Sequence, residues 1–127
     1  MLKKKKVVVL GGGNGSAATL VALKQNFKKF DITAIVSMSD SGGSSGKLRK
    51  EFGVLPPGDI MRAVLALSKY DYTILKKIFY RNRFLVEGKL NKHNLGNIFL
   101  TLGAKYCGNF LKIIEALSQS VEAIGKV

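Results

Sequence analysis

A glycine-rich loop directly follows the first apolar run of the chain. Glycine lets a backbone turn tightly and lets a ligand approach without a clash against a Cβ atom. A segment with helical spacing starts at Ser16, so free backbone N–H groups and the helix dipole favour an anion at this loop. A strand-to-helix turn alone needs fewer glycines, and we therefore predict phosphate binding. The candidate residues are Gly11, Gly12, Gly13, Asn14 and Gly15.

This loop departs from the fingerprint of dinucleotide-binding dehydrogenases. Gly11 and Gly13 match its first two glycines, but Ser16 replaces the third. An acidic residue is expected at the tip of the second strand, and Asp31 lies at the wrong end of that strand. The sequence therefore disfavours an NAD dehydrogenase.

A second polar loop follows the second apolar run, so it faces the same crevice as the first loop. It resembles a P-loop, but Ser41 takes the place of the first glycine and Leu48 replaces the residue that holds magnesium. Its hydroxyl and N–H groups suit a phosphate or a ribose. Asp40 is either a ligand of a sugar hydroxyl or metal, or a loop-capping residue. The candidate residues are Asp40, Ser41, Gly42, Gly43, Ser44, Ser45 and Gly46.

Two cations and a Pro-Pro-Gly-Asp segment follow the second loop. Lys47 and Arg49 lie in the first turns of the next helix, where either reaches a phosphate or stays solvated. Gly58 and Asp59 come before another helix. Asp59 is expected at its N-cap position, and a ligand or metal role for Asp59 stays open.

The fourth candidate group contains His93, Asn94 and Asn97. His93 is the only histidine, so the chain can hold no histidine metal cluster. His93 and Asn97 share a helix face if the helix starts early, and both could then bind a ligand. Helix capping and packing are the alternative roles.

Strands and helices between these motifs must bring them together. Two β-branched apolar runs with a helix between them predict a parallel β-α-β unit, with strands buried on both faces. We expect strands at residues 7–10, 32–36 and 84–86, and helices at 16–29, 44–52, 59–67, 72–80, 95–102 and 110–124.

The fold class that follows is α/β, a Rossmann-like three-layer fold around a parallel sheet. Sheets average about five or six strands, which is more than this chain supplies. We therefore expect an incomplete sheet, with residues 1–127 forming the N-terminal part of one nucleotide-binding domain and no second domain.

Composition narrows the class of protein. The net charge of +13 raises nucleic-acid binding as a possibility, but the lysines are scattered apart from residues 3–6. A lysine-rich solvated surface is the simpler interpretation. The single Cys107 and the absence of a long apolar run fit a soluble, cytoplasmic protein.

Taken in order, residues 7–15, 40–49, 55–60 and 93–97 resemble the gluconeogenesis factor family, which is related to 2-phospho-L-lactate transferase. The resemblance spans almost the whole chain, although known members are about twice as long. Three positions depart from the family pattern. Asn14 stands where threonine is usual, and Lys92 stands where glycine is typical. The family commonly has an arginine immediately after the Pro-Gly-Asp segment, whereas here Met61 comes before Arg62.

The resemblance implies a regulatory protein that binds UDP-sugars and supports cell-wall precursor supply and cell shape. On this view Gly11 to Gly15 hold the diphosphate, the Asp40 to Gly46 loop reads ribose or sugar, and Arg49 neutralises phosphate charge. Asp59, His93 and Asn97 would line the same crevice.

Two alternatives remain. One is a transferase of deazaflavin coenzyme synthesis, in which magnesium is the cofactor and Asp40 and Asp59 are its candidate ligands. The other is a basic nucleic-acid-binding module. We expect the full-length form to be a homo-oligomer.

Overall fold

The computed structural model of the chain describes residues 2–37, 43–53 and 57–127. Two strands and seven helical segments are assigned in this part. In chain order they are β1 (Lys5–Gly11), α1 (Gly13–Lys24), β2 (Phe30–Val36), α2 (Gly43–Phe52), α3 (Gly58–Leu67), α4 (Tyr72–Lys76), the π-helical segment η1 (Lys77–Arg81), α5 (Leu95–Cys107) and α6 (Phe110–Ser120).

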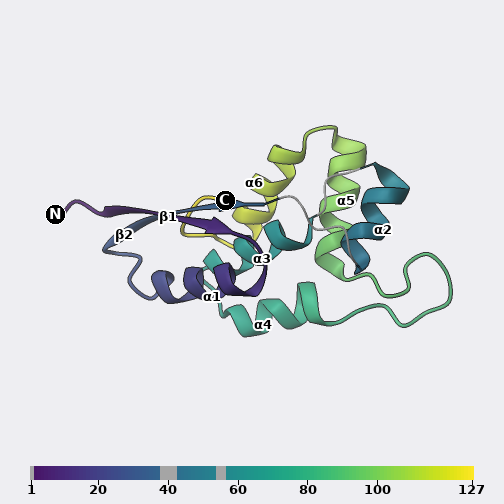
Figure 1. Cartoon of the computed structure of the whole chain (residues 1–127), viewed down its shortest axis with the longest axis horizontal. Coiled ribbons are helices and arrows are strands. Elements are labelled where there is room, and N and C mark those ends of the chain that lie inside the picture. Colours follow the sequence, from purple (N-terminus) through teal and green to yellow (C-terminus); the bar gives the residue numbers. More distant parts are fainter. Residues whose placement is uncertain (1, 38–42, 54–56) are drawn as a thin grey trace.

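The first part of the chain forms the β-α-β unit that the apolar runs predict. β1 and β2 pair in parallel, with Val8 opposite Thr33 and Leu10 opposite Ile35, and α1 packs against both strands (Figure 1). The helix is shorter than the sequence predicts, because residues 25–29 turn back toward β2 through bonds such as Asn26 N–H to Leu23 O. The α/β class is confirmed.

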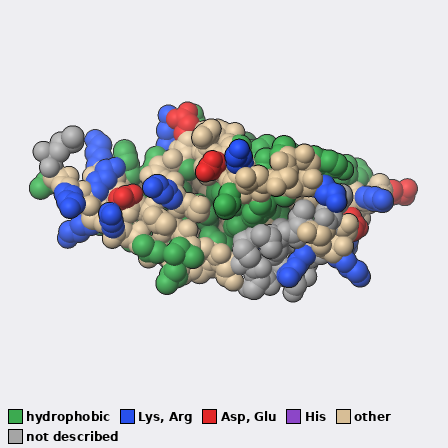
Figure 2. Space-filling view, turned by 90° about the horizontal axis from the view of Figure 1, so that it is seen from above, with side chains coloured by type: hydrophobic (Ala, Val, Ile, Leu, Met, Phe, Trp, Pro, Cys, Tyr) green, Lys and Arg blue, Asp and Glu red, His purple; other side chains and the backbone are tan. Residues whose placement is uncertain are grey.

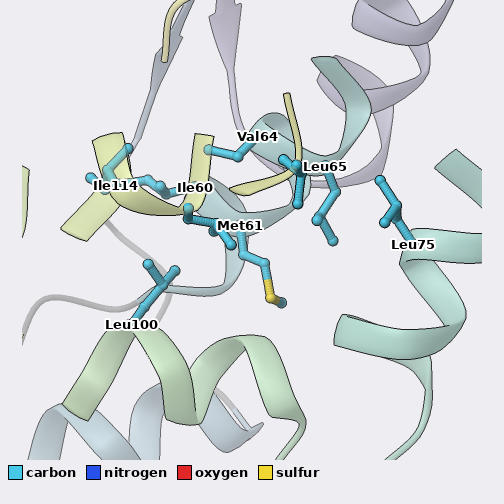
Figure 3. Packing of buried hydrophobic residues seen from close by; sticks show 9 residues of the cluster. Ile60, Met61, Val64, Leu65, Leu75, Leu100 and Ile114 are labelled. Atoms are coloured by element: carbon cyan, nitrogen blue, oxygen red, sulfur yellow. The ribbon is translucent and has the colours of Figure 1, made fainter. Parts of the chain in front are cut away.

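α3 lies at the centre of the molecule and joins its two hydrophobic clusters. One face of α3 packs with Ala17, Leu20 and Ile32 of the β-α-β unit. The other contacts Leu100 and Ile114, from α5 and α6 (Figure 3). α3 itself is apolar almost all round, which is typical of a buried helix.

The close packing of α3 against α5 depends on a glycine. Met61 is fully buried and points between the two helices (Figure 3). A Cβ atom on Gly96 would lie 1.6 Å from Met61 Sδ, so a larger residue at that crossing would displace the Met61 side chain.

The prediction that Asp59 caps α3 is wrong. Met61 N–H donates to Pro57 O, which closes the first turn earlier, and Pro57 occupies the N-cap position. Asp59 is therefore the second residue of the helix. Its carboxylate lies near the positive end of the helix dipole, where a negative charge is favourable, but it does not cap the helix.

The helices predicted at residues 44–52, 72–80 and 95–102 are confirmed. The second half of the helix predicted at 72–80 is π-helical, over residues 77–81. The predicted strand at 84–86 is wrong. Only an isolated antiparallel bridge forms there, between Arg83 and Asn94, and Leu85 and Val86 are exposed. The last helix ends at Ser120, before the apolar residues at 121 and 124.

One face of the sheet is covered and the other is open in the described part of the chain. Val8, Leu10 and Ile35 point away from α1 and are 56%, 73% and 56% exposed. Both faces are expected to be buried in a parallel sheet, so this finding differs from the sequence prediction. Beyond β2, the Lys126 backbone pairs with Ile32 and Ala34.

Candidate functional site

The glycine-rich loop lies at the carboxyl end of β1 and runs directly into α1. Gly11 and Gly13 have φ values of +149° and +72°, and Gly12 is extended at the N-cap position without a side-chain cap. The first N–H groups of a helix have no partner within the helix. The loop therefore presents backbone donors at the positive end of α1, which suits an anion.

The N-terminal turn of α3 approaches this loop. A Cβ atom built on Gly12 would lie 2.9 Å from Asp59 Oδ2, and one on Gly13 would lie 3.7 Å from Arg62 Nη1. The extended backbone at Gly12 is open to any residue, so glycine is favoured there by the close approach of the Asp59 carboxylate. Two helix starts, of α1 and α3, converge at the carboxyl end of β1.

Arg62 is a site residue that the sequence prediction missed. Its Nη1 donates to Asp59 Oδ1 at 3.2 Å, and its guanidinium lies 4.3 Å from the centre of the Tyr80 ring. The i, i+3 spacing of Asp59 and Arg62 on a helix was the available signal. These contacts hold the arginine beside the glycine loop.

The second polar loop lies largely outside the described residues. Asp40, Ser41 and Gly42 are not described, and Gly43, Ser44, Ser45 and Gly46 form the start of α2. Arg49 is exposed and lies in the last turn of α2, not its first turns as predicted. Ligand binding by this loop stays a prediction.

His93 is buried between α2 and α5. It lines a cavity of about 150 Å³ with Leu48, Glu51 and Thr101, and residues 11–15 do not contribute to its wall. Burial lowers the pKa of the imidazole, with Glu51 opposing that shift and Lys47 and Arg83 adding to it. The ring is therefore held neutral near pH 7.

Three other predicted site residues are buried, and one of them has a structural role. Asn94 is fully buried, and its Oδ1 accepts the N–H of Asn97 at 2.8 Å, which caps α5. Asn97 is buried in the first turn of that helix, and Gly58 is buried as the first residue of α3. Their contact with a ligand stays a prediction.

One of the two carboxylates expected at a magnesium ion can be placed. Asp59 lies at the glycine loop, but one of its oxygens is engaged by Arg62. Asp40, its expected companion, belongs to the segment that is not described. The described residues thus supply one carboxylate for a magnesium ion, and this carboxylate is already paired with Arg62.

One group of lysines lies at the opposite end of the sheet from the glycine loop, and other Lys and Arg side chains are spread over the molecule (Figure 2). Lysine side chains surround the amino end of β1 (Figure 2), where Lys3, Lys5, Lys28 and Lys29 line a shallow hollow. This group of lysines is therefore not part of the glycine loop.

No helix in residues 2–37, 43–53 or 57–127 is both long and apolar enough to cross a membrane.

Comparison with known proteins identifies relatives over most of the chain. The family model for 2-phospho-L-lactate transferase CofD matches residues 7–127. A putative gluconeogenesis factor of Thermotoga maritima is 43% identical over 110 residues, covering 87% of this chain and 34% of that protein. The gluconeogenesis factor of Listeria monocytogenes is 42% identical over 115 residues, covering 89% of this chain and 35% of that protein.

A solved structure of a Bacillus halodurans protein has the same fold over this region. It superposes with a TM-score of 0.87 at 42% identity, covering 98% of this chain and 39% of that one. The chain spans about one third of the length of the curated relatives it matches.

Proposed function

The chain belongs to the family described as 2-phospho-L-lactate transferase CofD, and from this premise we propose that it binds a UDP-sugar through its glycine loop. Its role would be regulatory, in the manner of a gluconeogenesis factor that supports cell-wall precursor supply and cell shape. Relatives with that name match this chain at about 40% identity. A cytoplasmic location and a homo-oligomeric full-length form belong to the same proposal.

The observation that carries the proposal is the meeting of the glycine loop with the first turn of α3. Gly12 and Gly13 leave backbone donors free, and Arg62 lies within reach of the loop. A diphosphate needs several donors and positive charge together, which this place provides. Predicted contacts from the loop at 40–46 would then read the ribose or sugar.

A second candidate function rests on the family's own description, which is that of a transferase. In that case Asp59 would hold magnesium together with Asp40, and the metal would stabilise charge on the transferred phosphoryl group. Asp59 would then have to leave Arg62, its present partner.

Calorimetric titration of the 127-residue chain separates these functions. UDP-N-acetylglucosamine is compared with GDP plus magnesium, for the wild type and for Gly12→Ala. The alanine Cβ would lie 2.9 Å from Asp59 Oδ2, so the Asp59 carboxylate or the loop must shift, and we expect affinity to fall. Thr19→Ala, on an exposed part of α1, is the matched control.

Saturable binding of the UDP-sugar by the wild type and Thr19→Ala, lost in Gly12→Ala, supports the proposal. A preference for GDP with magnesium supports the transferase instead. If the chain is folded by circular dichroism and binds neither ligand, the proposal is wrong for this chain.

A further inference from the structure

Arg62 is held close to the glycine loop by contacts that, among the described residues, use one of its donors. A guanidinium has five N–H donors. One of them, on Nη1, meets Asp59, and the buried Nε has no hydrogen-bond partner in the described part of the chain. A buried donor without a partner is costly, so this arginine is set to bind a further acceptor.

The Tyr80 ring lies against the guanidinium. The Arg62 Cζ atom lies 4.3 Å from the ring centre, at a distance typical of cation–π stacking. Asp59 and Tyr80 come from different helical segments, α3 and η1, so the arginine is fixed from two directions. Its side chain is only 18% exposed, which strengthens its interaction with an anion.

A negative charge beside the glycine loop also has to be offset by a cation. Asp59 Oδ2 lies close to Gly12, and a phosphate bound at the loop would meet its negative charge. Arg62 is the cation that offsets Asp59 there. Arginine binds phosphate oxygens in a bidentate manner and carries a full positive charge, which backbone N–H groups do not supply.

We propose that Arg62 binds the second phosphate of a nucleoside diphosphate whose first phosphate lies on the glycine loop. The ligand class is then a nucleoside diphosphate or its sugar ester, in preference to a monophosphate. Because the arginine supplies the positive charge, binding needs no divalent metal. This inference rests on the proposed function and adds the residue that selects its ligand.

The test compares UDP with UMP, each titrated into the chain in EDTA and again with magnesium. The wild type is expected to bind UDP at least about tenfold more tightly than UMP, in EDTA as in magnesium. Arg62→Gln is expected to lower the ratio of UDP to UMP affinity by about tenfold, because both ligands lose the charge that offsets Asp59 but only UDP loses the contact to its second phosphate. Arg62→Lys should restore part of the difference, since it keeps the charge.

Arg83→Gln is the matched control. Arg83 also lies near Tyr80, at 5.9 Å, but is exposed and donates to the carbonyl of Lys92. Its variant should keep the wild-type ratio of UDP to UMP affinity. A role of Arg62 in folding alone would change both affinities together, and circular dichroism of each variant checks the fold.

The results distinguish this inference from the proposed function. If UDP and UDP-N-acetylglucosamine bind the wild type and Gly12→Ala abolishes binding, the function stands. An unchanged UDP-to-UMP ratio in Arg62→Gln, or UDP binding only with magnesium, then overturns the role of Arg62. If the wild type binds neither ligand, both proposals are wrong.

Discussion

Lys92 adopts a backbone conformation that is ordinarily reserved for glycine. Its φ is +66°, and its N–H donates to Phe84 O while its own carbonyl accepts from Arg83. These bonds hold the strained geometry in place. The family resemblance predicts glycine at this position, and the positive φ supplies the physical reason.

We expect Lys92→Gly to raise the free energy of unfolding by about 0.5–1 kcal/mol, measured by urea denaturation. The gain comes from removing the left-handed strain, less the extra entropy that glycine has in the unfolded chain. Lys89→Gly is the control, because Lys89 carries the same charge in the same exposed loop without a positive φ. An equal loss of stability in both variants would contradict the expectation.

His93 should make the stability of the fold depend on pH. Its pKa in the folded chain is lowered, mainly by burial, while the unfolded side chain titrates near about 6.5. Below that pH the unfolded chain binds more protons, so the free energy of unfolding should fall as the pH drops from 7 toward 5.5.

The measurement is urea denaturation across that range for the wild type and His93→Asn. The chain has one histidine, so the variant removes histidine titration altogether and should lose the slope. A slope that survives in His93→Asn would assign it to other groups, and one of opposite sign would refute the lowered pKa.

At the residue scale the sequence identifies the glycine loop but not its neighbour Arg62. Consecutive glycines between an apolar run and a helix are typical of an anion-binding turn, so residue type and position suffice to predict it. In the structure Met61 is fully buried and packs against Gly96 of α5, while Arg62 lies beside the glycine loop, and contacts between segments far apart in the sequence decide both placements.

At the scale of elements, α5 and α6 begin with the same kind of cap in different surroundings. Asn94 and Asn109 each accept a backbone N–H three residues on, at 2.8 and 3.2 Å. Asn94 is fully buried, whereas Asn109 is exposed. Water can therefore hydrogen-bond to the exposed start of α6 if the Asn109 cap is removed, but it cannot do so at the buried start of α5.

Asn94→Ala should therefore lower the free energy of unfolding by about 2 kcal/mol, and Asn109→Ala by about 0.5–1 kcal/mol. Chemical denaturation of the two single variants gives both values. Asn94→Ser keeps an acceptor and should recover part of the loss. Equal costs at the two positions would mean that burial does not add to the cap.

The elements themselves follow from the sequence where local pattern and packing agree. Residues 7–10 and 32–36 are continuous apolar runs joined by a helix, and they pair as expected. Residues 84–86 have the same apolar character, but no neighbouring strand in the described chain gives them a partner. Pairing is a non-local property, so composition alone predicted a strand that does not form.

At the scale of the whole molecule, the sheet leaves apolar side chains uncovered. Val8 and Leu10 alternate with the half-buried Val7 and Val9, so the open face is continuous along β1. The strand pairs with β2 on one side, and no strand of the described residues pairs on its other side. An apolar face next to an unpaired edge promotes association with other copies of a chain.

We therefore expect the purified chain to associate with itself through this face, and Leu10→Lys to shift it toward monomer. Burying a leucine contributes about 1.5–3 kcal/mol, and a lysine there would oppose contact with charge as well. Leu111→Lys is the matched control, because Leu111 on α6 is 71% exposed and Leu10 is 73% exposed. Sedimentation velocity over a range of concentrations measures the effect. If both variants dissociate equally, net charge explains association better than the sheet face. If neither does, the contact lies elsewhere on the molecule.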